Sequence, residues 1–224
     1  MNLSSETFQP LQELSFIRHA FTLRTSEDTK ADGFPHRVVQ SLGFTHFAAA
    51  EQIHGNSVAV VDPSSSCFYL YSESPDCVGV NFRGGSFPGV DALVTREPNL
   101  PLVIRCADCA GVFVVDRATP AIALVHSGRR GTQANIVGNT VATMRQAFGT
   151  DPRQCVAVIS PSIGPCHYEM DIWSGAERQL REAGVLDIHN PRVCTACHLD
   201  RYFSYRAEKG KTGRMLAVLV LCTH

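Results

Sequence analysis

The stretch "RCADCAGVFVVDRATPAIALVHSGRRG", residues 105–131, decides the fold. It contains two short apolar runs, 111–116 and 121–127, which are rich in Val, Ile and Ala, as buried central strands are. The residues between them, 117–120, read Arg-Ala-Thr-Pro, which is typical of a turn. We therefore predict a β-hairpin. Polar, metal-capable groups precede the first run, in Arg-Cys-Ala-Asp-Cys (105–109), and end the second, in His-Ser-Gly-Arg-Arg-Gly (126–131), and their presence next to buried strands indicates a site.

Further segments on both sides of the hairpin have the same strand-like composition. We predict strands at 46–54, 57–62, 92–96, 100–106, 155–160 and 215–221, and helices at 35–42, 132–148 and 173–184. Gly149 follows the second helix and suits a C-cap. Because the strands cluster without regular βαβ alternation, we expect an α+β fold with mixed sheets and flanking helices, formed by a single domain over 1–224. The Ser-, Pro- and Gly-rich zone 62–89 is predicted to be a long loop or lid.

The composition favours a compact enzyme for small molecules. The chain has 224 residues, 44% hydrophobic and 18% charged, with a formal net charge of −1. A near-neutral charge gives no reason to expect nucleic acid or an anionic membrane as a partner, and we predict no obligate protein partner. No run approaches about 18 apolar residues, and the first 25 residues lack an apolar core after a basic start. We therefore expect a cytoplasmic protein.

Two metal-capable side chains lie at one end of the predicted hairpin. Cys109 precedes the first strand by two residues, and His126 is near the end of the second, so the two side chains are expected to meet. His54, in "EQIHG", is a third candidate. Two imidazoles and a thiolate suit Zn²⁺, and three protein ligands leave a fourth position open, as in catalytic zinc sites.

Candidate anion-binding groups follow the hairpin. Arg129 and Arg130 lie between glycines ahead of a predicted helix, and a guanidinium beside a helix N-terminus can bind phosphate. The loop "SPSIGPCHYE", 160–169, is expected to line the same cleft and to supply Cys166, Tyr168 or backbone donors. Asp108 is either a general acid or base or the cap of its own turn.

Nine cysteines are expected to be mostly free thiols in a reducing compartment. Cys106–Cys109 and Cys194–Cys197 form two CxxC pairs, but 84 residues separate them, against 15–20 in a zinc ribbon, so we do not expect one shared site. "CTACH", 194–198, matches a haem-attachment pattern, whose chemistry requires export, and we expect no haem.

Several motifs occur together in an order that resembles one family. They are "EQIHG", "DALVT", "ADC", "HSGRRGT", "SPSIGPCHYEM" and "CTACHLDRYFSYRAEKGKTGR". The chain resembles the laccase-domain family, also called multicopper polyphenol oxidoreductases, from about Arg24 to Arg214. The resemblance implies one α+β domain with a central β-sandwich flanked by helices.

The resemblance also implies an activity and a ligand set. It implies phosphorolysis of adenosine, inosine and methylthioadenosine, with adenosine deaminase side activity, and zinc held by His54, Cys109 and His126. Nucleoside and phosphate are then the partners. Arg24, in "FTLRT", matches an arginine of the family's site, and Arg130 matches the arginine of HAGWRG. Arg129 replaces the tryptophan of that motif, and Cys197 and His198 are additions to the pattern.

Three alternatives remain open on the same residues. The first is copper-dependent oxidation of phenols, which nine scattered histidines do not favour. The second is a cysteine hydrolase, such as an amidase acting on cell-wall precursors, with Cys109 as nucleophile and His126 as base. The third is a binding module in which Cys106 or Cys166 closes a structural zinc site.

Overall fold

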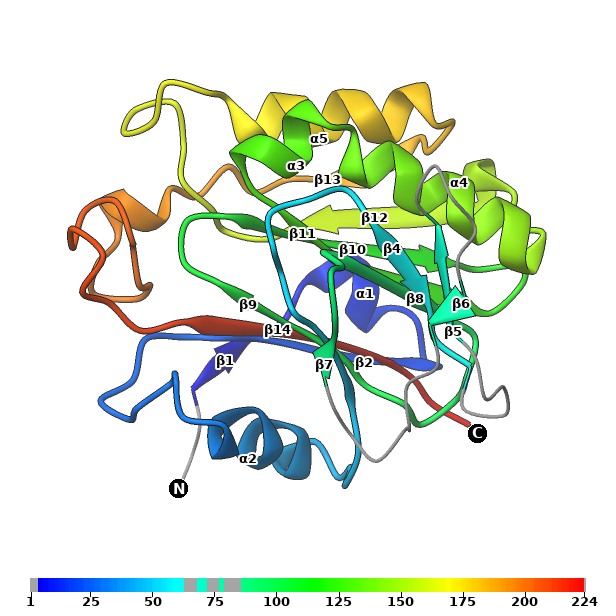
Figure 1. The fold of residues 1–224 in the computed structure, drawn as a ribbon, viewed down its shortest axis with the longest axis horizontal. Coiled ribbons are helices and arrows are strands. Elements are labelled where there is room, and N and C mark those ends of the chain that lie inside the picture. Colours follow the sequence, from blue (N-terminus) through cyan, green and yellow to red (C-terminus); the bar gives the residue numbers. More distant parts are fainter. Residues whose placement is uncertain (1–3, 63–67, 72–76, 79–85, 224) are drawn as a thin grey trace.

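Two β-sheets packed face to face form the body of the protein, as seen in a computed structural model (Figure 1). The structure describes residues 4–62, 68–71, 77–78 and 86–223. The first sheet has six strands in the order β1-β2-β14-β9-β3-β7, and the second has eight in the order β13-β12-β10-β11-β8-β4-β5-β6. Both sheets mix parallel and antiparallel neighbours, so the expected α+β sandwich is confirmed.

The strands of the six-stranded sheet are β1 (Ser5–Glu6), β2 (Ile17–Thr22), β14 (Met215–Leu221), β9 (Leu102–Cys106), β3 (Ala48–Ala50) and β7 (Ser86–Phe87). Those of the eight-stranded sheet are β13 (Asp187–His189), β12 (Cys155–Ile159), β10 (Ala110–Asp116), β11 (Ala121–Ser127), β8 (Ala92–Thr95), β4 (Val58–Val60), β5 (Phe68–Tyr71) and β6 (Cys77–Val78). The helices are α1 (Gln9–Gln12), α2 (Gly33–Ser41), α3 (Arg129–Gln133), α4 (Ile136–Phe148) and α5 (Ile172–Glu182), with 3₁₀ turns at η1 (Pro152–Gln154) and η2 (Thr195–Cys197).

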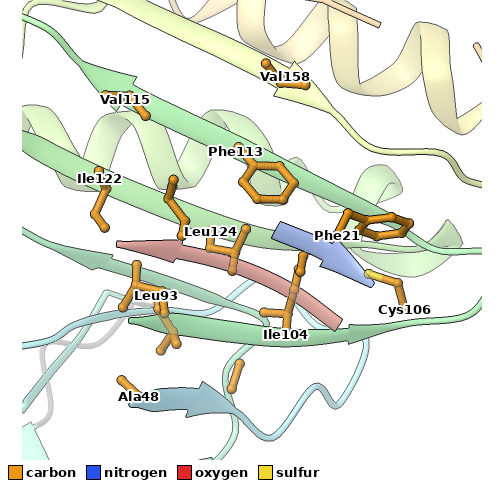
Figure 2. Packing of buried hydrophobic residues seen from close by; sticks show 14 of the residues in the cluster. Phe21, Ala48, Leu93, Ile104, Cys106, Phe113, Val115, Ile122, Leu124 and Val158 are labelled. Atoms are coloured by element: carbon orange, nitrogen blue, oxygen red, sulfur yellow. The ribbon is translucent and has the colours of Figure 1, made fainter. Parts of the chain in front are cut away.

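Strands with two apolar faces explain the layered architecture. Successive side chains of a strand point to opposite faces of the sheet. On β10, Phe113 and Val115 belong to the core between the sheets, whereas Val112 and Val114 belong to the core under α4 and α5. The side chains between the two sheets, Phe113 and Ile104 among them, are drawn in Figure 2. Helix α2 covers the outer face of the six-stranded sheet, and the apolar side chains between them form a third core.

The hairpin β10–β11 forms as predicted, and its register pairs Gly111 with His126. The strand predicted at 46–54 is wrong beyond Ala50, because the chain leaves the sheet there and takes positive φ values at Gln52 and His54. Those values, 67° and 61°, are incompatible with an extended strand.

The helix predicted at 132–148 is interrupted, which is a second correction. Asn135 has a φ of 60° and separates α3 from α4. Asn tolerates this left-handed region better than most residues. The side chain of Gln179 on α5 replaces the lost helical bonds, because it accepts from the amide of Val137 and donates to the carbonyl of Thr132. The predicted C-cap is confirmed at Gly149, whose φ is 74°.

The predicted long loop 62–89 contains β5, β6 and β7. Its use as a lid falls mostly on residues 63–67, 72–76 and 79–85, which lie outside the described residues. Within the described part of the chain, no helix has the length and apolar character that a bilayer crossing requires.

Candidate metal centre and cavity

The register of the β10–β11 hairpin places Cys109 and His126 side by side. Ala110 pairs with Ser127, so Cys109, one residue before β10, faces Gly128, one residue after β11. The sequence predicts this meeting from two strand patterns and a turn. It does not reveal that Gly128 is the residue that faces Cys109.

His54 reaches the same point from the loop after β3. Asp91, which directly precedes β8 and is fully buried, holds this loop. Its carboxylate accepts hydrogen bonds from the backbone amides of His54, at 2.9 Å, and Gly55, at 2.6 Å. These charge-assisted bonds fix a backbone segment that has no sheet partner.

Asp91 also orients the imidazole of His126. Its Oδ1 lies 2.8 Å from Nδ1 of His126, and both side chains are buried. Burial opposes ionisation of Asp91, but the bonds from His126 and the two amides outweigh it and lower the pKa of the carboxyl. An ionised Asp91 accepts a hydrogen bond from the protonated Nδ1 of His126. Nε2 of His126 is then available as a metal ligand, as in other carboxylate–histidine pairs at metal sites.

The donor atoms of His54, Cys109 and His126 fit a metal ion. They all lie within 4.8 Å of one another. A Cβ atom at Gly128 would lie 2.7 Å from Sγ of Cys109 and 3.3 Å from Nδ1 of His54. Since Gly128 has an extended backbone, with φ −99° and ψ −175°, the glycine is needed for space and not for conformation. The three donor atoms of the group are two nitrogens and a sulfur, the ligands that zinc prefers.

Cys109 and His126 also form an ion pair in the absence of a metal. Burial alone would raise the pKa of the Cys109 thiol, but His126 and His54 lower it to about 6. Burial would likewise lower the pKa of His126, but the Cys109 thiolate and Asp91 raise it to about 9. At neutral pH the pair is therefore a thiolate beside an imidazolium.

A cavity of about 630 Å³ opens above these three side chains. Its lining consists of Glu51, Gln52, His54, Arg105, Ala107, Asp108, Cys109, His126, Arg129, Ile163, Tyr168, Ile172, Tyr205, Arg206 and Arg214. The volume suits a small molecule, and four of the lining residues are arginines. The site can therefore hold a small molecule in contact with both a metal ion and an anion bound by the arginines.

Asp108 and Tyr168 both line the cavity. Asp108 has a φ of 84° and ties together two distant segments, because its carboxylate accepts from the hydroxyl of Thr195 at 2.7 Å and from the amide of Arg206 at 2.6 Å. The guanidinium of Arg206 lies 4.6 Å from the centre of the Tyr168 ring. The observed contacts of Asp108 are those of a residue that organises the cavity wall.

The predicted arginines divide into two groups. Arg129 lines the cavity, where it pairs with Glu169 at 2.5 Å. Arg130 is on α3 and is exposed, and it is not among the residues that line the cavity. Arg24 also lies elsewhere, bound to Glu208 at 2.6 Å and stacked on Phe203. The structure thus does not bring Arg24 or Arg130 to the cavity.

Sequence reasoning missed Asp91 and Arg105. Asp91 begins the motif "DALVT", but a carboxylate before a strand carries no signal of its own. Arg105 is the penultimate residue of β9, and its Nε is buried without a hydrogen-bond partner among the described residues. A buried guanidinium nitrogen with no partner is unusual, and it marks Arg105 as an anion-binding candidate that the strand pattern concealed.

Neither cysteine suggested as a fourth ligand joins this site. Cys106 is fully buried in the core between the sheets. Cys166 is close to His167, Cys194 and Cys197, in a separate group. The two CxxC pairs likewise do not meet, as expected, because Cys109 and Cys194–Cys197 belong to different groups.

The chain matches a family model described as multi-copper polyphenol oxidoreductase laccase, over residues 35–171 and 167–222. It is 34% identical over 165 residues to a protein of Bacteroides thetaiotaomicron named purine nucleoside phosphorylase, a match covering 59% of this chain and 61% of that protein. It is 32% identical over 197 residues to a Corynebacterium glutamicum protein of the same name, covering 76% and 72% of the two chains.

Two crystal structures share the fold. YlmD from Geobacillus stearothermophilus superposes with a TM-score of 0.81 at 23% identity, over 96% of this chain and 94% of that chain. The Bacillus licheniformis hypothetical protein YfiH superposes with a TM-score of 0.83 at 21% identity, over 98% and 97%. These similarities extend the match to nearly the whole chain at the level of the fold.

Proposed function

The chain belongs to the multi-copper polyphenol oxidoreductase laccase family, and we propose that it is a zinc-dependent purine nucleoside phosphorylase. Relatives that carry this activity in their names support the proposal. Inosine, adenosine and methylthioadenosine, each with phosphate, are the proposed substrates.

One observation carries the proposal. The donor atoms of His54, Cys109 and His126 lie within 4.8 Å of one another, at a cavity that four arginines also line. Three protein ligands leave a coordination position open, where zinc supplies Lewis-acid stabilisation of negative charge on a substrate oxygen. A structural zinc site with four protein ligands has no open coordination position. An apolar binding pocket would not be lined by four arginines.

The proposed phosphate site is built on Arg105. Its side chain lines the cavity, and a phosphate oxygen there would accept hydrogen bonds from its guanidinium. Arg206 and Arg214 line the same cavity and add positive charge. Glu169 pairs with both Arg129 and Arg206 and partly neutralises them, so we assign these two arginines secondary roles.

Phosphorolysis forms a bond between a phosphate oxygen and C1′ of the ribose and breaks the bond from C1′ to the purine nitrogen. The electron pair of that bond leaves with the purine, which takes up a proton. The cationic side chains hold the phosphate, and Tyr168, which also lines the cavity, is the proposed wall for the purine base. Asp108 positions Arg206 and Thr195 through its two carboxylate oxygens.

A direct test uses inosine and phosphate with purified, zinc-loaded protein. Hypoxanthine and ribose 1-phosphate are expected, and no product is expected without phosphate. His126→Ala removes a ligand and should reduce turnover at least about 100-fold, since the metal would lose one of its protein ligands. Arg153→Ala, at an exposed arginine that pairs with Asp151 outside the cavity lining, serves as the matched control.

Unchanged turnover in His126→Ala would remove the metal site from the reaction. Inosine formed from adenosine without added phosphate would instead reveal the deaminase activity that we propose as a side reaction. Stoichiometric copper in the purified protein would favour phenol oxidation. The free cysteines of the described chain fit the reducing cytoplasm, where we propose that the enzyme acts.

The thiolate–imidazolium pair favours a second candidate. A Cys109 thiol with a pKa of about 6 beside His126 is the arrangement of a cysteine hydrolase. His54 distinguishes the two candidates, because a hydrolase needs only Cys109 and His126. His54→Ala should abolish a zinc-dependent reaction and spare hydrolysis of an amide.

A further inference from the structure

A second group of metal-capable side chains lies outside the cavity, and the proposed function does not use it. It consists of Cys166, His167, Cys194 and Cys197, whose ligand atoms all lie within 4.8 Å of one another. None of the four is among the residues that line the cavity. We call these four residues the Cys₃His cluster.

The distances within the cluster match those of a tetrahedral zinc site. Around zinc, the bond lengths to sulfur and nitrogen imply separations of about 3.8 Å between two sulfurs and about 3.6 Å between a sulfur and a nitrogen. Sγ of Cys166 lies 3.6 Å from Sγ of Cys197. Nδ1 of His167 lies 3.3 Å, 3.8 Å and 3.5 Å from the sulfurs of Cys166, Cys194 and Cys197.

The backbone presents the four ligands in a way typical of structural zinc. Cys194 and Cys197 have the Cys-x-x-Cys spacing; Cys194 directly precedes the single turn η2, and Cys197 is its last residue. The amide of Gly164 donates to Sγ of Cys194 at 3.2 Å, a bond that stabilises a thiolate ligand. Cys166, His167 and Cys197 are exposed, so an ion can enter from solvent.

The cluster joins two segments that build the cavity wall. The loop after β12 carries Ile163 and Tyr168, which line the cavity. The segment around η2 carries Thr195, which donates to Asp108. These segments also meet through backbone bonds between Ser162 and its neighbours Val193 and Thr195. A metal ion in the cluster would fasten one wall segment to the other.

We propose that Cys166, His167, Cys194 and Cys197 bind a second, structural Zn²⁺ ion that fixes the loop carrying Tyr168 against η2. Four protein ligands close the coordination sphere, so this ion holds no substrate. The site shares no residue with the group of His54, Cys109 and His126. The proposal therefore does not depend on the reaction that the protein catalyses.

Metal analysis of variants tests this proposal. Protein purified with zinc should contain two zinc ions per chain, one for each group. The double variant Cys166→Ser/Cys197→Ser should contain one, His126→Ala should contain one, and the combination should contain none. Cys222→Ser is the matched control, because Cys222 is a free cysteine outside both groups, and it should retain two.

Cobalt substitution provides a second readout that does not depend on activity. In His126→Ala, Co²⁺ should give strong sulfur-to-cobalt charge-transfer absorption from three thiolates, and Cys166→Ser/Cys197→Ser should abolish it in that background. Zinc content and phosphorolysis are measured separately. If the unmodified protein bound two zinc ions but did not catalyse phosphorolysis, only the proposed function would be contradicted.

Three results would overturn the second site. The first is that the double cysteine variant has the same zinc content and cobalt spectrum as the unmodified chain. The second is that mass spectrometry of the native protein finds Cys166 and Cys197 joined as a disulfide. The third is that copper, and not zinc, occupies the cluster.

Discussion

Gly128 is the residue on which the proposed catalytic metal site depends most directly. In Gly128→Ala the new Cβ would lie 2.7 Å from Sγ of Cys109, in the space that the ion needs. We expect zinc affinity to fall at least about tenfold, because two ligands must move. The measurement is competition with a chromophoric chelator in the Cys166→Ser/Cys197→Ser background, where only this site remains.

Gly33→Ala is the control for Gly128→Ala. Its Cβ would meet only the flexible guanidinium of Arg37, at 3.3 Å, on a helix that covers the opposite sheet. If Gly128→Ala bound zinc as tightly as Gly33→Ala, the ion would have to lie away from Cys109 and His54.

The ion pair of Cys109 and His126 predicts a pH dependence of zinc binding. His126, with a pKa of about 9, is protonated below that pH and must lose its proton to bind a metal. Zinc affinity should therefore rise about tenfold per pH unit between pH 6 and 9. Below about pH 6 the Cys109 thiolate also takes up a proton, and the dependence should steepen.

Calorimetry in buffers of different ionisation enthalpy measures this effect. In the Cys166→Ser/Cys197→Ser background, one proton should be released for each zinc ion bound near neutral pH. Zinc binding without proton release there would contradict the protonated state of His126.

At the scale of single residues, the sequence predicts the ligands better than the groups that hold them. Cys109 and His126 follow from strand patterns and a turn, because the register of a short hairpin leaves few alternatives. Asp91 and Arg105 could not be predicted in this way. Asp91 acts through contacts across the fold and Arg105 through its position at the cavity, and no local pattern encodes either. The Cys-x-x-Cys pair at Cys194 was visible, but its partners come from a loop about 30 residues away in sequence.

Among the secondary-structure elements, the break between α3 and α4 has a measurable energetic consequence. Gln179 of α5 is buried and bonds to the amide of Val137 and the carbonyl of Thr132. Gln179→Leu keeps the side chain's approximate size but leaves the amide of Val137 without its partner, whereas the carbonyl of Thr132 still accepts from the amide of Asn135. We expect a loss of about 1–3 kcal/mol in the free energy of unfolding for the unsatisfied amide, measured by urea denaturation.

Gln146→Leu on the exposed side of α4 is the comparison for Gln179→Leu. It should change the free energy of unfolding by less than about 0.5 kcal/mol. Equal effects of the two variants would show that Gln179 does not stabilise the break.

The helix break also explains what sequence patterns miss at this scale. The apolar spacing that predicts the helix begins only at Ile136, and Asn135 gives no signal of a break, since Asn is only moderately unfavourable in a helix. The compensating side chain is on another helix. The early end of β3 has the same origin, because Ala and Glu around residue 50 fit a strand as well as a loop, whereas the hydrogen bonds to Asp91 fix the loop.

For the whole molecule, the shared core between the two sheets predicts one cooperative unfolding transition. Phe113 is fully buried in that core. Phe113→Ala should lower the free energy of unfolding by about 3–5 kcal/mol, because it leaves a cavity between the sheets. Leu186→Ala, at a side chain that is 73% exposed, should change it by less than about 0.5 kcal/mol.

Calorimetry and denaturant titration measure both variants. One transition that moves to lower temperature in Phe113→Ala supports a single domain over residues 1–224. Two separate transitions, of which the substitution shifts only one, would divide the chain into independent units.

The layered architecture was the most predictable feature at this scale. Strands with apolar residues on both faces must be covered twice, once by another sheet and once by helices. The order of the strands was not predictable, since β14 at the end of the chain pairs with β2 and β9. Pairings between segments so far apart in the sequence leave no trace in local composition.

The central claim is that His54, Cys109 and His126 hold one metal ion at the cavity. Anomalous diffraction measured above and below the zinc absorption edge, from crystals of the protein purified with zinc, tests this claim most directly. We predict a peak about 2.0–2.3 Å from Sγ of Cys109, from Nε2 of His126 and from a ring nitrogen of His54. A map without a peak among these three side chains, in crystals whose cavity is open to solvent, would contradict it.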